Sequence, residues 1–279
     1  MYRHRRAVAD ARLIAGVRLT DTGHVMIHDL QTILDGWEYE PGKISVRKII
    51  GRDGQAKIQT RVDLGVLQLE IDGRPDGERP HGFSSLLEYQ EHELRRHVQS
   101  CGCDAGFELS AEDCHELRLE AYLYYQRYLS LFVLEEFDGV HRDTERNLRL
   151  IDLIERYATR ERDREAFGSQ RAYVLMMNIR ARAYDALGRG APETALATVT
   201  RGIARVRGCT AEDCCPADEE TAPEVEVLEA LQCEVLHKMS EDAPARLHYE
   251  LDAAVVAEDF ERAAELRDKL DSVREKTSD

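Results

Sequence analysis

The sequence predicts a mainly α-helical (α+β) protein with a small antiparallel β-hairpin or meander near its N-terminus. Two observations lead to this fold class. Strand-like alternation is confined to the first 82 residues, and apolar residues at helical spacing occupy most of the remainder. With 279 residues, 43% of them hydrophobic, the chain can form one large or two smaller domains. The predicted segments are an N-terminal β segment (1–82), a helical domain (83–207), an acidic linker (208–223), and a helix followed by a helical hairpin (224–279).

The strand signals lie between residues 44 and 71. Residues 44–50 are rich in β-branched side chains and are followed by a Gly-Arg-Asp-Gly turn signal at 51–54. Residues 57–64 alternate between apolar and polar, and the alternation changes phase at Gly65. A glycine at a phase change indicates a β-bulge, so we expect one there.

Helical spacing dominates residues 83–207. We expect helices over about 83–98 and 113–137, a break at Asp138-Gly139, and further helices near 148–154 and 172–186. A second break follows at Gly188-Arg189-Gly190, and another helix starts at Pro192. A long helix, a glycine turn and a shorter helix thus occur twice, and residues 183–196 resemble a degenerate tetratricopeptide repeat. An ordinary helical bundle with two hairpins explains the pattern equally well. Both arrangements offer a surface for protein partners.

The last element carries the most specific signal. Leu247, Leu251 and Ala254 precede a break near Glu258-Asp259, and a second apolar stripe follows: Phe260, Ala263, Leu266, Leu270, Val273. Residues 251–270, with Asp-Phe-Glu-Arg-Ala-Ala-Glu-Leu-Arg-Asp at 259–268, closely resemble the UVR motif. This helical hairpin is shared by the UvrB and UvrC subunits of bacterial excision repair, by Clp-type chaperones and by the activator of a protein arginine kinase. Leu251 and Val255 stand where the motif commonly has methionine and alanine.

The resemblance implies a hairpin that pairs with another copy of itself, in the same or a partner protein. We expect the small Ala254, Ala263 and Ala264 to allow close helix approach, and Phe260 to fill the base of the hairpin. A stripe of Leu251, Leu266 and Leu270 would then face a second hairpin, and Arg267 and Asp268 would set its register. These nine residues are the predicted partner-binding site. The alternative is that the hairpin packs on the chain's own helices.

These features predict a non-enzymatic interaction or adaptor protein of a bacterium. The partner class implied by the resemblance is an excision-repair subunit or a Clp-family chaperone, or a second copy of this chain. The sequence contains no phosphate-binding Gly-x-x-x-x-Gly-Lys-Ser/Thr loop, no Gly-x-Ser-x-Gly and no His-Glu-x-x-His. We therefore predict no catalytic residue and no cofactor.

A ligand-binding protein or small enzyme is the alternative class. If the phase change at Gly65 turns Gln68 and Glu70 toward Arg61, these residues and Asp63 could form a buried polar site. The same alternation is equally typical of the solvated face of a half-exposed sheet.

Charge argues against a general nucleic-acid-binding domain. The formal net charge is −16, and residues 209–279 hold 21 of the 54 acidic but only 7 of the 38 basic residues. Residues 142–207 contain 14 arginines, 9 acidic residues and no lysine. This run could form a groove for nucleic acid or an acidic peptide, contact the acidic tail, or be neutralised by ion pairs within helices such as Asp152–Arg156.

Seven cysteines without an export signal indicate a reducing, cytoplasmic setting. Cys101, Cys103 and Cys114 lie about a hundred residues from Cys209, Cys214, Cys215 and Cys233, and neither group has zinc-site spacing. We predict no metal site. No apolar run is long enough to span a membrane, so we predict no membrane partner.

Overall fold

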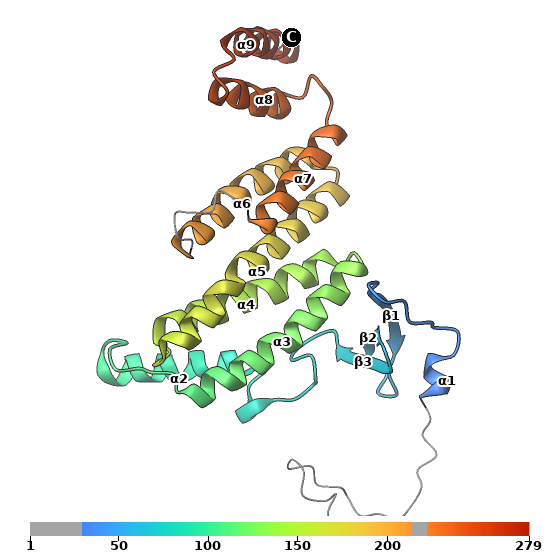
Figure 1. The fold of residues 1–279 in the computed structure, drawn as a ribbon, viewed down its shortest axis with the longest axis vertical. Coiled ribbons are helices and arrows are strands. Elements are labelled where there is room, and N and C mark those ends of the chain that lie inside the picture. The colour runs from blue at the N-terminus through green and yellow to red at the C-terminus, as the bar shows by residue number, and fades with distance from the viewer. Residues whose placement is uncertain (1–29, 214–221, 279) are drawn as a thin grey trace, which may run out of the picture. The chain divides into compact units, whose positions relative to one another are not determined.

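A computed structural model describes residues 30–213 and 222–278 of the chain. The chain divides into two compact units, residues 1–38 and residues 39–279. In the first unit the described residues contain one short helix, α1 (Gln31–Leu34). The remaining described elements belong to the second unit (Figure 1). They confirm the predicted mainly α-helical fold with a small antiparallel sheet.

Three short strands form the sheet in the order β1-β2-β3, with β1 at Ser45–Ile50, β2 at Ala56–Val62 and β3 at Gly65–Glu70. The predicted bulge at Gly65 is wrong, because Gly65 pairs directly with Val62 across a two-residue turn. In this register Ile58 pairs with Leu69, so an even-numbered residue faces an odd-numbered one. The apolar side chains therefore lie at even-numbered positions in β2 and at odd-numbered positions in β3 because the chain reverses direction at the turn. No inserted residue is needed.

Six helices follow: α2 (Leu86–Cys101), α3 (Ala111–Val133), α4 (Phe137–Tyr157), α5 (Glu161–Gly188), α6 (Pro192–Asp213) and α7 (Pro223–Lys238). From α3 to α7, each helix packs against the next one in the chain (Figure 1). Ser110 begins α3 with a reciprocal capping box, in which its hydroxyl accepts from the Asp113 amide and Asp113 accepts from the Ser110 amide. The last two helices, α8 (Pro244–Val256) and α9 (Phe260–Ser278), form the C-terminal hairpin.

The break between α3 and α4 differs from the prediction. Asp138 and Gly139 lie inside the first turn of α4, and α3 ends at Val133. Glu135 follows with a positive φ of 59°, and the Glu136 amide donates to the Leu131 carbonyl at 2.9 Å. This is a Schellman ending, in which the left-handed residue is a glutamate instead of the usual glycine.

Helix α5 ends in the same way at Gly190, where φ is 71° and the Ala191 amide donates to the Ala186 carbonyl at 2.9 Å. Here the left-handed residue is a glycine, and the predicted break is confirmed. The two helix ends share one backbone geometry and differ in the residue that adopts it.

The sheet and the helices share their largest apolar core. Ile58 and Leu69 from the strands are buried in the same cluster as Leu131 of α3. The Thr60 and Ser130 hydroxyls meet 2.6 Å apart between β2 and α3. A second cluster joins α2 to α3, α4 and α5 around Leu87, Leu117, Ile154 and Phe167. These contacts fix the sheet against α3.

A buried ion pair fastens the loop after β3 to the helices. Arg127 of α3 donates to both carboxylate oxygens of Asp143 in α4, at 2.7 Å each, and each side chain is 1% exposed. The same guanidinium donates to the backbone carbonyls of Glu70 and Gly73. The Asp143 charge is thereby neutralised inside the protein, as a buried carboxylate requires.

The predicted boundaries at 82, 207 and 223 remain predictions, as does the tetratricopeptide resemblance. Helix α6 extends to Asp213, into the predicted linker 208–223, and α7 begins at Pro223. Linker residues 214–221 lie outside the described residues.

Candidate partner-binding site

The C-terminal hairpin consists of α8 and α9 joined by residues 257–259. Glu258 has a positive φ of 58°, and the Asp259 amide donates to the Ala254 carbonyl at 2.9 Å. The Asp259 carboxylate accepts from the Arg262 amide at 3.0 Å and so caps the start of α9. The predicted break near Glu258-Asp259 is confirmed.

The hairpin has a small apolar core of its own. Five residues are buried between its two helices, with Leu251 and Val273 partly buried against them: Leu247, Ala254, Ala263, Leu266 and Leu270. The predicted close approach at Ala254 and Ala263 agrees with this packing, whereas Ala264 is exposed. The expected open stripe of Leu251, Leu266 and Leu270 is wrong in its geometry. Leu266 and Leu270 are only 2% and 3% exposed, because they form the hairpin's own core together with Leu247, Ala254 and Ala263.

Phe260 lies outside this core. We expected it to fill the base of the hairpin, but its side chain is exposed. Phe260 is the first residue of α9 and precedes Ala263, where the buried stripe begins, by one helical turn. Its aromatic surface is therefore available at the tip.

Three apolar side chains gather at this end of the hairpin. Val255, Val256 and Phe260 are 50%, 85% and 69% exposed, and we call them the apolar tip. The sequence analysis did not single out the two valines as exposed side chains. The signal for them was the valine that replaces the motif's usual alanine at position 255, beside a second valine at the helix end. The predicted Arg267 and Asp268 are also exposed, with their charged groups 3.9 Å apart.

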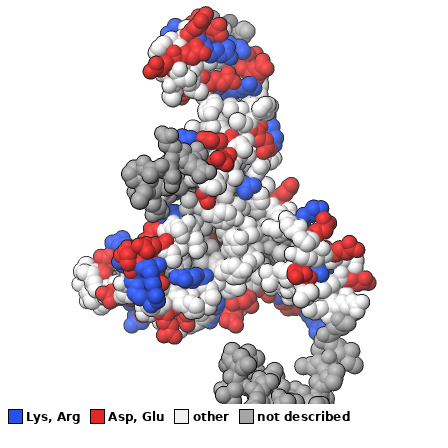
Figure 2. Space-filling view, viewed as in Figure 1, with Lys and Arg blue, Asp and Glu red and all other residues white. Residues whose placement is uncertain are grey.

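Contacts from the hairpin to the rest of the chain come from its other end. The Tyr249 hydroxyl donates to the Gln232 side chain of α7 at 2.9 Å. Arg246 donates to the carbonyls of Leu236 and Met239, and Lys269 pairs with Asp242 at 3.2 Å. Charged side chains of both signs cover the hairpin surface (Figure 2). The start of α8 therefore packs on the chain's own helices, as the alternative predicted, whereas the apolar tip does not.

The polar strand residues are not gathered into one pocket. Gln68 lies opposite Gln59 and accepts from its amide at 3.0 Å, and Glu70 pairs with Lys57. Arg61 donates to the backbone carbonyls of Asp63 and Gly65, where it supports the β2–β3 turn. A cavity of about 330 Å³ is lined by Arg61 and Asp63, together with residues of α3, but not by Gln68 or Glu70.

Most of the arginines between 142 and 207 have acidic partners. The expected Asp152–Arg156 pair is wrong: Arg156 pairs with Asp104, and Asp152 pairs with Arg171 of the next helix. Such pairs join elements far apart in sequence, as Arg149 and Glu91 also do. The run is thus largely neutralised between helices.

The described cysteines do not assemble a metal site. Cys101, Cys103 and Cys233 are exposed, and Cys114 is buried. Among the residues that the structure describes, no three histidine, cysteine, aspartate or glutamate side chains lie close enough together to hold a metal ion. Within the same residues, no helix combines the length and apolar character needed to cross a bilayer.

Comparison with known proteins yields one match. Residues 245–276 match the family model of the UvrB/uvrC motif, which spans α8 and most of α9. No curated protein matches the chain, and no solved structure does. The match covers the hairpin that carries the apolar tip and does not extend to α2–α7 or the sheet.

Proposed function

Since the chain carries a UvrB/UvrC motif at residues 245–276, we propose that it is a non-enzymatic adaptor that binds a protein partner through the apolar tip. The observation that supports this most directly is the exposure of Val255, Val256 and Phe260 at one end of a hairpin whose own core is already filled. Adjacent apolar side chains left in water are typical of a protein-interaction surface.

The energetics fit a docking surface. Fully burying a valine or phenylalanine side chain contributes about 1.5–3 kcal/mol each, so the tip can supply several kcal/mol to a complex. Aromatic residues in particular tend to dominate binding energy when a partner encloses them. Arg267 and Asp268, both exposed on α9, would add orientation at the rim of the interface.

The partner we propose is the corresponding hairpin of a bacterial excision-repair subunit, UvrB or UvrC. Hairpins of this kind pair with one another, and a second hairpin with an exposed tip would cover the first. A Clp-type chaperone with a similar hairpin is the second candidate, and a second copy of this chain is the third.

Affinity capture with the full chain tests the proposal. The double variant V256S/F260S removes apolar surface from the tip, and I50S/L64S removes it from exposed positions at the end of β1 and in the β2–β3 turn. Mass spectrometry of the captured proteins should show UvrB or UvrC with the wild type and with I50S/L64S, but not with V256S/F260S. Capture of a Clp-family protein by the wild type and I50S/L64S, but not by V256S/F260S, would instead indicate a role in proteolysis. A partner list that is identical for all three proteins would refute docking through the tip.

A further inference from the structure

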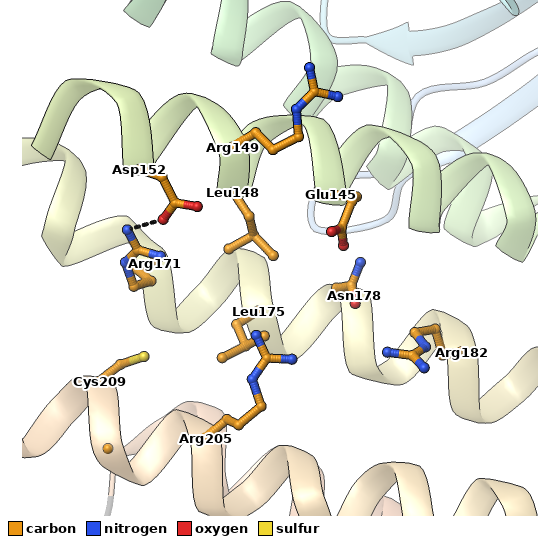
Figure 3. A pocket seen from close by; sticks show the side chains of 11 residues that line it. Glu145, Leu148, Arg149, Asp152, Arg171, Leu175, Asn178, Arg182, Arg205 and Cys209 are labelled. Carbon is orange, nitrogen blue, oxygen red and sulfur yellow. Dashed lines mark ion pairs between the residues drawn. The ribbon is translucent and has the colours of Figure 1, made fainter. Parts of the chain in front are cut away.

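A groove on the helical body lies away from the hairpin and has no part in the proposed function. Its wall and floor residues come from α4, α5 and α6, and its volume is about 420 Å³ (Figure 3). Four arginines line it: Arg149 from α4, Arg171 and Arg182 from α5, and Arg205 from α6. Two carboxylates, Glu145 and Asp152, line it as well.

Two of the four lining arginines have acidic partners. Arg149 pairs with Glu91 at 2.7 Å, and Arg171 pairs with Asp152 at 2.7 Å. Within the described residues, neither Arg182 nor Arg205 forms an ion pair or a hydrogen bond. In Figure 3 the Arg205 side chain extends from α6 toward Leu175 of α5. Arg182 lies further along α5. Arg182, Arg205 and the Glu145 carboxylate thus border one opening without ion-pair partners among the described residues, which leaves one net positive charge there.

The floor of the groove is apolar and fixed. Leu148 and Leu175 form part of it, and Leu175 is 2% exposed. Beside them, the buried Asn178 amide of α5 donates to the Thr144 hydroxyl of α4 at 2.9 Å. This bond holds the two helices in register beneath the arginines. A binding surface that needs no rearrangement loses less entropy when it binds.

We propose that this groove binds an acidic peptide segment of a partner protein. Guanidinium groups favour carboxylates through short, charge-assisted hydrogen bonds, and the partly exposed Leu148 offers an apolar contact beside them. The volume is sufficient for a few side chains. Glu145 and Asp152 lie among the arginines and separate their positive charges from one another. This spacing suits carboxylates that are themselves spaced along a peptide. A nucleic-acid backbone presents closely spaced phosphates, which two separate unpaired arginines do not match.

Fluorescence anisotropy with the full chain tests this proposal. The probe is a fluorescein-labelled short peptide of alternating glutamate and leucine. We expect saturable binding to the wild type, and an affinity about tenfold lower for R182Q/R205Q because two charge-assisted contacts are lost. The matched control is R95Q/R162Q, which removes the same charge from two exposed arginines outside the groove and should leave the affinity unchanged.

Three outcomes would overturn the proposal. These are an absence of peptide binding to the wild type, equal weakening by both double variants, and binding of a labelled single-stranded DNA oligonucleotide in preference to the peptide with loss in R182Q/R205Q. The tip variant V256S/F260S should bind the peptide as the wild type does. This measurement therefore separates the groove from the proposed function of the hairpin.

Discussion

Gly202 allows α6 to lie close against α5. A Cβ atom at this position would lie 2.6 Å from Cδ1, 2.7 Å from Cγ2 and 2.9 Å from Cγ1 of the buried Ile179. We predict that G202A lowers the free energy of unfolding by about 1–3 kcal/mol, because three side-chain atoms must move in a packed core. Urea denaturation followed by circular dichroism measures this change.

Gly208 in the same helix provides the control, because a Cβ there meets nothing within 4 Å. G208A should raise stability by about 0.5–1 kcal/mol through the better helix propensity of alanine. Equal effects of the two substitutions would contradict the close helix contact at Gly202.

Asp143 is the acidic partner of the buried Arg127. We predict that D143A lowers the free energy of unfolding by about 3–5 kcal/mol, because it leaves a buried guanidinium without its counter-charge. D72A removes a carboxylate whose side chain is 90% exposed from its pair with Arg142, and should cost less than about 1 kcal/mol. A D143A protein as stable as D72A would show that water reaches Arg127.

Burial raises the pKa of the Cys114 thiol to about 11, and the nearby Asp163 and Asp113 carboxylates act in the same direction. The reactive thiolate is therefore scarce at Cys114 near neutral pH. In the folded protein at about pH 8, iodoacetamide should modify the exposed Cys101, Cys103 and Cys233 and spare Cys114. Peptide mapping measures the difference, which should disappear in urea. Early modification of Cys114 in the folded protein would contradict its burial.

Helix ends mark where the sequence was sufficient and where it was not. The end of α5 was predicted because Gly190 adopts the left-handed conformation that glycine tolerates at little cost. The end of α3 was misplaced because Glu135 adopts the same conformation, while the nearby Gly139 lies inside α4. Gly139 is instead explained by packing, since a Cβ there would lie 2.9 Å from Leu131 Cδ1.

The left-handed conformation of Glu135 can be tested by substitution. E135G should raise the free energy of unfolding by about 1 kcal/mol, because it removes the steric cost of a left-handed non-glycine residue. The same change at the exposed Glu165, inside α5, should lower it by about 1 kcal/mol through lost helix propensity. Thermal unfolding of both variants measures the two signs. Destabilisation by E135G would indicate that the Glu135 side chain itself holds the turn.

The C-terminal hairpin was predicted as an element, but its exposed face was not. Apolar spacing located both helices and the break, because periodicity reports which residues can share a side. It does not say which apolar residues the hairpin needs for its own core. Leu266 and Leu270 were used there, and Phe260 was left exposed. A two-helix hairpin has so small an interior that the apolar stripe with Leu266 and Leu270 is buried between its own helices.

At the scale of the whole molecule, local apolar periodicity predicted the fold class but not the long-range ion pairs. The strands, the helical region and the hairpin follow from local periodicity and turn residues. Pairs such as Arg156–Asp104 and Arg149–Glu91 depend on how the helices pack, which no local pattern contains. For the same reason the groove bordered by Arg182 and Arg205 could be suspected from the arginine run but not located.

The proposed function depends on the docking of a partner hairpin at the apolar tip. The most direct measurement is isothermal titration of purified UvrB into the full chain as wild type, V256S/F260S and I50S/L64S. We expect the tip variant to bind at least about tenfold more weakly than the wild type, since two exposed apolar side chains lose their burial. The control variant should match the wild type. Equal affinities for all three proteins, or no binding of UvrB by the wild type, would contradict the docking of UvrB at the apolar tip.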